Sequence, residues 1–408
     1  MSYLLHLVFS LILFKNVICL IPENLLLNTF IVKDKNYGTN RTEKYLNMTE
    51  LPTFFGYHVE EHAVKTEDGY ILKMLRIPGN RSVVFLMHGI VNSADDFMTL
   101  GPDNALSFLL ADAGYDVWLG NARGNKYCRQ HVTLSPEDVR FWNFSFHEIG
   151  IFDLPAMIDY ALEKSNKTEL TYIGHSQGTT VYFVMASMRP EYNKKVKFMV
   201  SLATIAWTSN IISPIVRIAL VIKDGYNFIS DVLRLKEFLP SNVITRFIFR
   251  EFCSSSKFAL MLCETLLFTV YGFDYGQVNM TQAPVELAHL PAGCSIKQIL
   301  HFLQQTASGE FGQYDHGTGG NMVAYGMEKP PAYPVNNIKT PIAILYGTND
   351  WLSALPDVFF FIKNVSSVFS LYKVPYERWN HMDYLFAREA KHLVYKKVLT
   401  LVKERAGQ

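Results

Sequence analysis

The segment that most constrains the fold is the pentapeptide Gly-His-Ser-Gln-Gly at residues 174–178, which directly follows the apolar run at residues 170–173. A strand that ends abruptly and continues as a helix at a Gly-x-Ser-x-Gly sequence is typical of a nucleophile elbow. The glycines allow backbone to approach backbone closely, and the serine hydroxyl is left exposed above the sheet. Residues 179–188 are compatible with the helix that should follow. The sequence therefore predicts a strand, a sharp turn at Ser176 and a helix.

The residues around this unit alternate between short apolar runs and longer helical stretches. Two extended runs, 57–64 and 70–77, flank Glu67-Asp68-Gly69, where Asp-Gly supplies the positive φ angles of a tight hairpin turn. Short, continuous apolar strands separated by helices imply an α/β fold with a mostly parallel sheet covered on both faces. Strands are expected at 83–87, 116–119, 170–173 and 198–203, and helices around 106–113, 154–163 and after Ser176.

The alternation lapses between about residues 207 and 334. This stretch contains aromatic residues and helical segments, such as 242–252 and 258–270, but no clear strand. The strand pattern resumes at 341–346 and near 369–374, and a C-terminal helix starts at about residue 388. We therefore expect one core domain interrupted by a mainly helical cap. In chain order, the expected parts are a signal peptide (1–19), the first part of the core (20–206), the cap (207–334) and the second part of the core (335–408).

The first residues have the character of a targeting segment. Residues 4–14 are apolar, and the compact residues 17–19 suit a signal-peptidase site, so we interpret residues 1–19 as a secretory signal peptide cut after Cys19. An uncleaved anchor is the alternative, because no basic residue precedes the apolar run and Lys15 follows it. The run is shorter than the roughly 20 residues that a membrane span requires. No later stretch is long and apolar enough to span a membrane.

The charge balance argues against nucleic acid as a partner. The formal net charge is +1, with 38 Lys and Arg against 37 Asp and Glu, so the sequence carries no electrostatic footprint for nucleic acid. Glycosylation sequons agree with the secretory route and with a secreted or lysosomal location. Asn143 is flanked by aromatic residues, so we expect it to be more buried than the other acceptors. The sequons lie at Asn40, Asn47, Asn80, Asn143, Asn166, Asn279 and Asn364.

The cysteines favour a disulfide over a metal site. Five are present, and four remain if Cys19 leaves with the signal peptide. Cys253 and Cys263 are the only close pair, and in an oxidising compartment they could close a short loop inside a helical segment. Cys128 and Cys294 are interpreted as buried free thiols. No Cys or His pair has the C-x-x-C or H-E-x-x-H spacing, so no metal site is expected.

A serine hydroxyl is a poor nucleophile near neutral pH, so Ser176 needs a base to take its proton and a third group to orient that base. Asp350 follows the strand expected to end at Tyr346, which places its carboxylate at the carboxyl edge of the sheet. His381 lies in the loop between the last strand and the last helix. The chain order Ser, Asp, His is that of α/β-hydrolases. We therefore interpret Ser176, Asp350 and His381 as a catalytic triad.

Other residues compete for two of these positions. Asp357 could be the orienting acid, but it lies beyond Asp350 on an expected helix. His316 and His301 compete with His381, but both fall in the expected cap. A third possibility is that all three triad candidates are ordinary loop residues.

Acyl transfer also needs hydrogen-bond donors aimed at the oxyanion of the tetrahedral intermediate, each worth about 3 kcal/mol. One is expected to be the backbone N–H of Gln177, directly after the nucleophile. The other is assigned to the backbone N–H of Ile90, in the turn after the strand at 83–87. His88 could be read as a base, but its position before the serine favours a structural role at this turn. His175 is expected to point away from the chemistry.

Several longer segments carry a specific resemblance. They are Gly56-Tyr57, residues 66–72, 109–118, 120–125 and 153–160, the elbow, and residues 349–352. Together these segments resemble the acid lipase family, which contains lysosomal acid lipase and gastric lipase, and particularly its insect members. The resemblance implies an α/β-hydrolase fold with a mostly parallel central sheet and a helical cap carrying a lid. It also implies hydrolysis of carboxylic esters of neutral lipids, with no cofactor.

The chain departs from the family pattern at a few positions. Ala354 stands where many relatives carry a second Asp after the catalytic one, which removes a rival for the acid role. Cys128 replaces Ser in the segment resembling Arg-Gly-Asn-x-x-Ser, and the family's third cap cysteine is replaced near Tyr271. None of these departures touches the triad.

Apolar residues of the cap suit a lipid substrate, because they could desolvate acyl chains and bind a lipid–water interface. For any one of them, packing within the cap's own core is the favoured alternative. They are Phe247, Ile248, Phe249, Phe252, Phe258, Leu260, Leu266 and Phe268.

The leading hypothesis is a secreted or lysosomal lipase. In this hypothesis Ser176 attacks the ester, His381 relays the proton to the leaving alcohol, and Asp350 orients the imidazole. The alternatives are a carboxylesterase for smaller or specialised esters, a non-catalytic lipid-binding protein on the same fold, and a peptidase.

Overall fold

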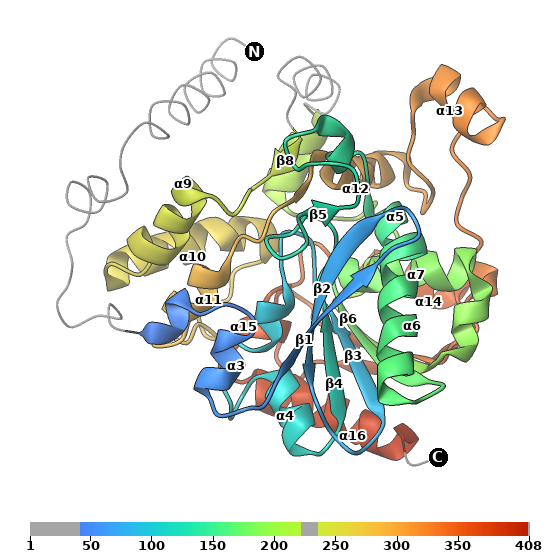
Figure 1. Ribbon diagram of the computed structural model, residues 1–408. Helices are drawn as coiled ribbons and strands as arrows, with labels where there is room; N and C mark the ends of the chain where they lie inside the picture. Colours follow the sequence, from blue (N-terminus) through green and yellow to red (C-terminus); the bar gives the residue numbers. More distant parts are fainter. Residues whose placement is uncertain (1–40, 222–235, 407–408) are drawn as a thin grey trace, which may run out of the picture.

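The computed structural model describes residues 41–221 and 236–406, and its centre is a nine-stranded, mostly parallel sheet (Figure 1). The strand order is β1-β2-β4-β3-β6-β7-β10-β11, with β5 paired to β2. The three pairs made by β2 are antiparallel, and every pair from β4 onward is parallel. The predicted sheet is therefore confirmed. Its strands are β1 (Glu60–Lys65), β2 (Tyr70–Ile77), β3 (Val83–Met87), β4 (Asp116–Gly120), β5 (Gln130–His131), β6 (Leu170–His175), β7 (Val196–Leu202), β10 (Ile342–Tyr346) and β11 (Val368–Lys373).

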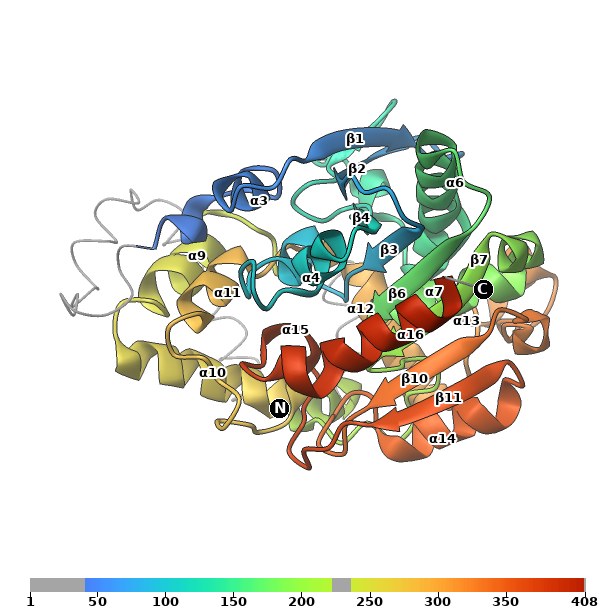
Figure 2. The same ribbon diagram turned by 90° about the horizontal axis from the view of Figure 1, so that it is seen from below.

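Helices cover both faces of this sheet (Figures 1 and 2). Every residue of β3 is buried, and its side chains alternate between two apolar cores. Phe85 packs into the core that contains residues of α6, α7 and α14, whereas Val84 and Leu86 pack into the core of α4 and α16. This burial on both faces is why the strands appear in the sequence as unbroken apolar runs. The helices are α4 (Leu106–Asp112), α6 (Leu154–Ser165), α7 (Gln177–Met188), α14 (Leu355–Asn364) and α16 (Lys396–Ala406).

The predicted C-terminal helix begins as a π-helical turn, η8, that continues directly into α16. Shorter helical elements join the layers. These elements are η1 (Thr42–Tyr45), α3 (Glu50–Phe54), η2 (Ala94–Phe97), η3 (Val139–Trp142), α5 (Phe146–Glu148), η4 (Ile149–Asp153), η5 (Pro190–Lys194), η7 (Val335–Asn337), α15 (Asp383–Phe386) and η8 (Lys391–Tyr395).

Strands β1 and β2 form the predicted hairpin, and its turn is tight, because the Gly69 N–H donates to the Thr66 carbonyl at 3.1 Å and the Thr66 N–H donates to the Tyr70 carbonyl at 2.8 Å. Positive φ angles were expected at Asp-Gly, but only Gly69 has one, at +99°. The Asp68 carboxylate instead accepts a hydrogen bond from Thr66 Oγ1 at 2.6 Å and pairs with Arg123 Nη1 at 2.5 Å. These contacts tie the turn to the buried side chain of Arg123.

We call residues 207–334 the cap, and its described residues, 207–221 and 236–334, lie beyond one end of the strands (Figure 1). The described part is mainly helical, and the predicted helical segments 242–252 and 258–270 are both present. The expectation of no strand is wrong in one detail, because Glu237–Phe238 pairs with Cys294–Ser295. A two-residue strand is too short to leave a periodic pattern in a sequence. The elements are β8 (Glu237–Phe238), α9 (Val243–Arg246), η6 (Phe247–Phe252), α10 (Lys257–Tyr271), α11 (Ala283–His289), β9 (Cys294–Ser295), α12 (Ile296–Ser308) and α13 (Gly317–Tyr325).

The predicted disulfide is present in the cap. It joins Cys253, at the end of η6, to Cys263 in α10. The two cysteines form a small apolar cluster with Leu260 and residues of α11. Cys128 and Cys294 are buried free thiols, as expected.

The sequon asparagines lie mostly on the surface. Asn143 is exposed, so the prediction that it is more buried than the others is wrong. The neighbouring Phe141, Trp142 and Phe144 turn into the core, while the Asn143 side chain faces outward and accepts a hydrogen bond from Lys297 Nζ at 3.0 Å. Asn47, Asn80, Asn166 and Asn364 are also exposed, and Asn279 is half-buried.

The signal peptide at residues 1–19 and the sequon at Asn40 lie outside the described residues. Within the two described ranges, no helix is long and apolar enough to cross a membrane.

Several carboxyl groups are buried where the cap meets the core. Glu264, Glu286 and Asp383 line a small cavity of about 40 Å³. Burial raises the pKa of all three, to about 7 for Glu264. A carboxyl group with a raised pKa binds its proton more tightly in the folded protein than in the unfolded chain. The contribution of Glu264 to the free energy of unfolding is therefore fully present in acid. It is lost as the pH rises from the ordinary Glu pKa of 4.5 through the folded-state pKa of about 7.

We predict that Glu264→Gln makes folding stability less sensitive to pH, because the amide stays neutral where the carboxyl group must ionise. The melting temperature of the unmodified protein should fall between pH 5 and pH 8, and the variant should lose less over that range. Glu310→Gln, at an exposed glutamate, is the control and should keep the original slope. Equal slopes for all three proteins would contradict the prediction.

Candidate active site

Ser176 lies at the sharp turn between β6 and α7, as its sequence context predicts. Its backbone has φ 53° and ψ −121°, a strained conformation for a residue with a side chain. The turn is possible because α7 approaches the end of β3 very closely. A Cβ atom at Gly178 would collide with the carbonyl oxygen of Met87, so only glycine fits there.

The side chains of Ser176, His381 and Asp350 form one hydrogen-bonded chain. His381 Nε2 lies 2.7 Å from Ser176 Oγ, and His381 Nδ1 lies 2.9 and 3.0 Å from the two Asp350 oxygens. Backbone N–H groups of Leu352 and Ser353 donate to Asp350 Oδ1 at 3.0 and 2.8 Å, which fixes the carboxylate. Since a carboxylate can only accept, Nδ1 carries the proton and Nε2 is free to accept the serine proton.

The competing residues are engaged elsewhere. Asp357 binds the backbone and side-chain nitrogens of Asn210 at 2.9 and 2.7 Å. His301 is buried between Ser145 Oγ and the Gly312 carbonyl, each 3.0 Å away. His316 is exposed at the start of α13. None of the three has a hydrogen bond to Ser176 in the described part of the chain.

Two backbone N–H groups next to Ser176 have no hydrogen-bond acceptor within the described chain. They belong to Gln177, the first residue of α7, and to Ile90, in the loop after β3. The loop passes close to the nucleophile, because a Cβ atom at Gly89 would lie 3.1 Å from Ser176 Cβ. Free N–H groups on both sides of a serine hydroxyl can receive a developing negative charge.

His88 and His175 support the site from behind. His88 Nδ1 donates to the Gly89 carbonyl at 2.7 Å, while its Nε2 accepts from the Ala122 N–H at 3.1 Å. His175 Nε2 donates to the His381 carbonyl at 2.8 Å. Burial lowers the pKa of His88 to about 4 and of His175 to about 3, so both rings are neutral. The expectation that these two residues have structural roles agrees with these contacts.

An apolar cavity of about 390 Å³ opens above Ser176. Its lining includes Ile90 and Val91 in the loop after β3, residues between 205 and 219, and residues of β8, α10 and α12. None of the eight cap residues singled out from the sequence lines it. Phe247, Leu260 and Phe268 are buried within the cap, whereas Phe258 and Leu266 are exposed. The α10 residues that face the cavity are Leu267, Val270 and Tyr271.

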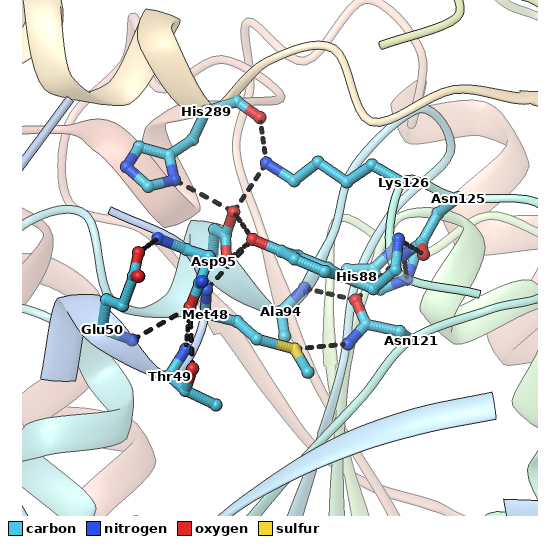
Figure 3. A network of polar contacts seen from close by, with 12 residues as sticks. Met48, Thr49, Glu50, His88, Ala94, Asp95, Asn121, Asn125, Lys126 and His289 are labelled. Carbon is cyan, nitrogen blue, oxygen red and sulfur yellow. Dashed lines mark hydrogen bonds and ion pairs between the residues drawn. The ribbon is translucent and has the colours of Figure 1, made fainter. Parts of the chain in front are cut away.

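A buried polar network surrounds Asp95 in η2 (Figure 3). Asp95 is at its centre and contacts Lys126 Nζ at 2.6 Å, His289 Nδ1 at 2.9 Å and the Tyr127 hydroxyl at 2.8 Å. Sequence reasoning missed this network, because its members share no motif and His289 is 194 residues from Asp95.

Known proteins resemble this chain over most of its length. Residues 82–385 match the family described as alpha/beta hydrolase fold, and residues 48–101 match the partial alpha/beta-hydrolase lipase region. Lipase 3 of Drosophila melanogaster is 42% identical over 84% of this chain and 89% of that protein. Gastric triacylglycerol lipase of Mus musculus is 38% identical over 90% of this chain and 94% of that protein.

The chain belongs to the acid lipase family of α/β-hydrolases. Among solved structures, a soluble variant of monoglyceride lipase from Saccharomyces cerevisiae covers 86% of this acid lipase chain and 96% of its own, with a TM-score of 0.50 and 14% identity. That likeness concerns the fold alone.

The departures from the acid lipase pattern have definite places in the structure. Ala354 is buried and directly precedes α14. Tyr271 lines the cavity, and its ring stacks on His381 with centroids 6.0 Å apart.

The described residues hold no group of three or more His, Cys, Asp or Glu side chains placed to bind a metal ion.

We predict that Gly178→Ala destabilises this acid lipase by about 1–3 kcal/mol, because the new methyl group meets the Met87 backbone, which cannot yield. Gly319→Ala is the matched control, since it also lies in a helix but has open space around it. That change should be neutral or stabilise the protein by up to about 1 kcal/mol. Denaturant unfolding of both variants measures the difference. Equal stabilities would show that the close approach at Gly178 does not constrain the elbow.

Proposed function

We propose that this chain is a serine ester hydrolase that cleaves carboxylic esters of neutral lipids, with triacylglycerols as the leading substrate class. One observation carries the proposal: the hydrogen-bonded chain Ser176–His381–Asp350 opens into an apolar cavity of about 390 Å³. The similarity to Lipase 3 of Drosophila melanogaster and to gastric triacylglycerol lipase of Mus musculus supports the same chemistry.

In the first half of the proposed reaction, Ser176 Oγ attacks the ester carbonyl while His381 Nε2 takes the hydroxyl proton. Asp350 stabilises the imidazolium that forms. The N–H groups of Gln177 and Ile90 receive the negative charge on the carbonyl oxygen. The carbon–oxygen bond to the alcohol then breaks, His381 gives its proton to the leaving oxygen, and the acyl group stays on Ser176.

In the second half, water attacks the acyl group and gives a proton to His381 Nε2. The bond between Ser176 Oγ and the acyl carbon breaks, the serine oxygen recovers its proton, and the fatty acid leaves. The two halves use the same donors, so no further group is needed for the chemistry.

The cavity supports a lipid acyl chain as the bound part of the substrate. Its lining is almost wholly aliphatic or aromatic, so burying an acyl chain there removes apolar surface from water. Ile215 and Leu239 line the cavity and are also 49% and 38% exposed. They therefore mark an apolar entrance through which a chain from a lipid–water interface could pass.

We propose the secretory pathway as the route of the protein, ending outside the cell or in the lysosome. The signal peptide expected at residues 1–19, the sequons and the Cys253–Cys263 disulfide support this route. We also propose that residues 207–334 are a cap with a lid inserted between core segments 20–206 and 335–408. The position of α10 and α12 over the cavity supports this division.

The first test is hydrolysis of emulsified triolein, cholesteryl oleate and p-nitrophenyl butyrate by the glycoprotein and its Ser176→Ala variant between pH 4 and pH 8. We expect oleate release from triolein that disappears in the variant. Cleavage of butyrate alone would replace this proposal with a carboxylesterase for smaller esters. An absence of serine-dependent activity on all three would indicate a lipid-binding protein.

A second test separates the two candidate acids. Asp350→Asn should lower kcat by roughly 10⁴-fold, because an amide can hold His381 in the wrong tautomer. Asp357→Asn is the matched control, and its kcat should stay within about threefold of the unmodified protein, since Asp357 binds only Asn210. The opposite order of effects would assign the acid role to Asp357.

A further inference from the structure

The loop at residues 88–93, which carries the proposed Ile90 donor and which we call the oxyanion loop, has a strained backbone. Val91 has a φ of +57°, which is unfavourable for a β-branched residue and persists only where surrounding contacts hold it. The Val91 carbonyl is held from outside the loop, by the N–H of Ala292 in the cap at 2.7 Å. The Gly89 carbonyl, on the same peptide unit as the Ile90 N–H, is held by His88 Nδ1 at 2.7 Å, so Ala292 acts on the other side of Ile90, where it holds the strained Val91 unit in place.

The cap residues just before Ala292 are anchored to the core through His289. Its Nδ1 lies 2.9 Å from Asp95 Oδ2, and its Nε2 lies 3.0 Å from the Glu43 carbonyl oxygen. Both partners can accept a hydrogen bond from the ring. Asp95 lies in η2, which directly follows the strained loop. The contact between His289 and Asp95 thus joins the cap to the far end of that loop.

Lys126 contacts both Asp95 and His289 and so strengthens the connection between them (Figure 3). Its Nζ lies 2.6 Å from Asp95 Oδ2 and donates to the His289 carbonyl oxygen at 2.8 Å. One ammonium group therefore bridges a core carboxylate and a cap backbone atom. Burial opposes ionisation of Asp95, but Lys126 and His289 outweigh it and hold the pKa of that carboxyl below its usual range. The carboxylate is consequently charged, and it contacts both the Lys126 ammonium group and the His289 ring.

We infer that Lys126, Asp95 and His289 form a latch that positions the oxyanion loop for the reaction, with Lys126 as its key member. The inference rests on the proposed function. Lys126 does not line the cavity and has no hydrogen bond to Ser176 in the described part of the chain. It is a positioning residue that acts through Ala292 and Val91 on the Ile90 donor.

A positioning role predicts a particular kinetic pattern. The Ile90 donor is needed where charge develops on the carbonyl oxygen, so its misalignment should lower kcat and leave KM nearly unchanged. A general loss of cap stability would lower the melting temperature without this selectivity. The chain offers a matched control for that case. Lys236 Nζ also ties the cap to the core, through the Pro136 carbonyl at 2.9 Å and Glu137 at 3.0 Å, but not to the oxyanion loop.

The experiment compares Lys126→Met, Lys126→Arg and Lys236→Met with the unmodified protein. For Lys126→Met we expect kcat on p-nitrophenyl butyrate to fall about 10- to 100-fold with KM within about twofold. Inhibition by butylboronic acid, whose adduct on Ser176 mimics the tetrahedral intermediate, should weaken by a similar factor. Lys126→Arg should recover most of the activity, and Lys236→Met should behave as the unmodified protein. Backbone amides of residues 88–93 should exchange hydrogen faster in Lys126→Met alone.

The latch is overturned if Lys126→Met keeps its kcat and its amide exchange, or if Lys236→Met shows equal losses. Should Lys126→Met fail to fold, His289→Gln is measured in the same way, because its amide retains a donor for Asp95. Failure of the proposed function gives a different result, namely unmodified protein without Ser176-dependent hydrolysis. In that case the exchange of residues 88–93 alone decides whether the latch holds the loop.

Discussion

The geometry of the site depends on how closely α7 packs against the end of β3. Because β3 and β6 are parallel neighbours with Met87 opposite Gly174, the loop after β3 leaves the sheet at the level of the elbow. The glycine at 178 lets the helix start there without a clash, which fixes the strained backbone of Ser176. The same contact brings Ile90 to the serine. One packing contact therefore sets the position of the nucleophile and of a neighbouring free N–H group.

Polar groups buried between the cap and the core determine how the residues around Ser176 and His381 are held. From the cap, Ala292 donates a hydrogen bond to the Val91 carbonyl, His289 contacts Asp95, and Tyr271 stacks on His381. The core contributes Asp95 and Lys126. Breaking one member of such a buried set leaves the other charges without partners, which costs more than the pair itself contributes. The cap is thus part of the structural support of the site as well as a cover over the cavity.

The sequence predicted the sheet well because its central strands are buried on both faces. Strand 83–87 was expected with the bounds that β3 has, since each of its residues is apolar. The proximity of Ser176, Asp350 and His381 also followed from the sequence, because parallel strands end at one edge of the sheet. Their catalytic roles stay a prediction.

Other features depend on contacts between distant residues and left no local pattern. The aromatic neighbours of Asn143 suggested burial, yet its own side chain points outward, since flanking residues do not decide side-chain direction in a loop. The turn at Asp68 is shaped by Arg123, which lies 55 residues away. The latch joins Lys126 to a cap residue 163 positions later. None of these pairings can be deduced from periodicity or motif spacing.

The Cys253–Cys263 disulfide spans a sequence separation of only 10 residues and lies wholly within the cap. Such a short covalent loop restricts the unfolded chain only locally and does not tie the cap to the sheet. The sheet owes its stability to the two apolar cores, and the remaining described cysteines are buried thiols. Since neither cysteine belongs to the two apolar cores of the sheet, reduction of this bond would release a restraint between η6 and α10 and leave those cores untouched. The disulfide is thus a local fastening of the cap, and the packing of the sheet does not depend on the redox state of the surroundings.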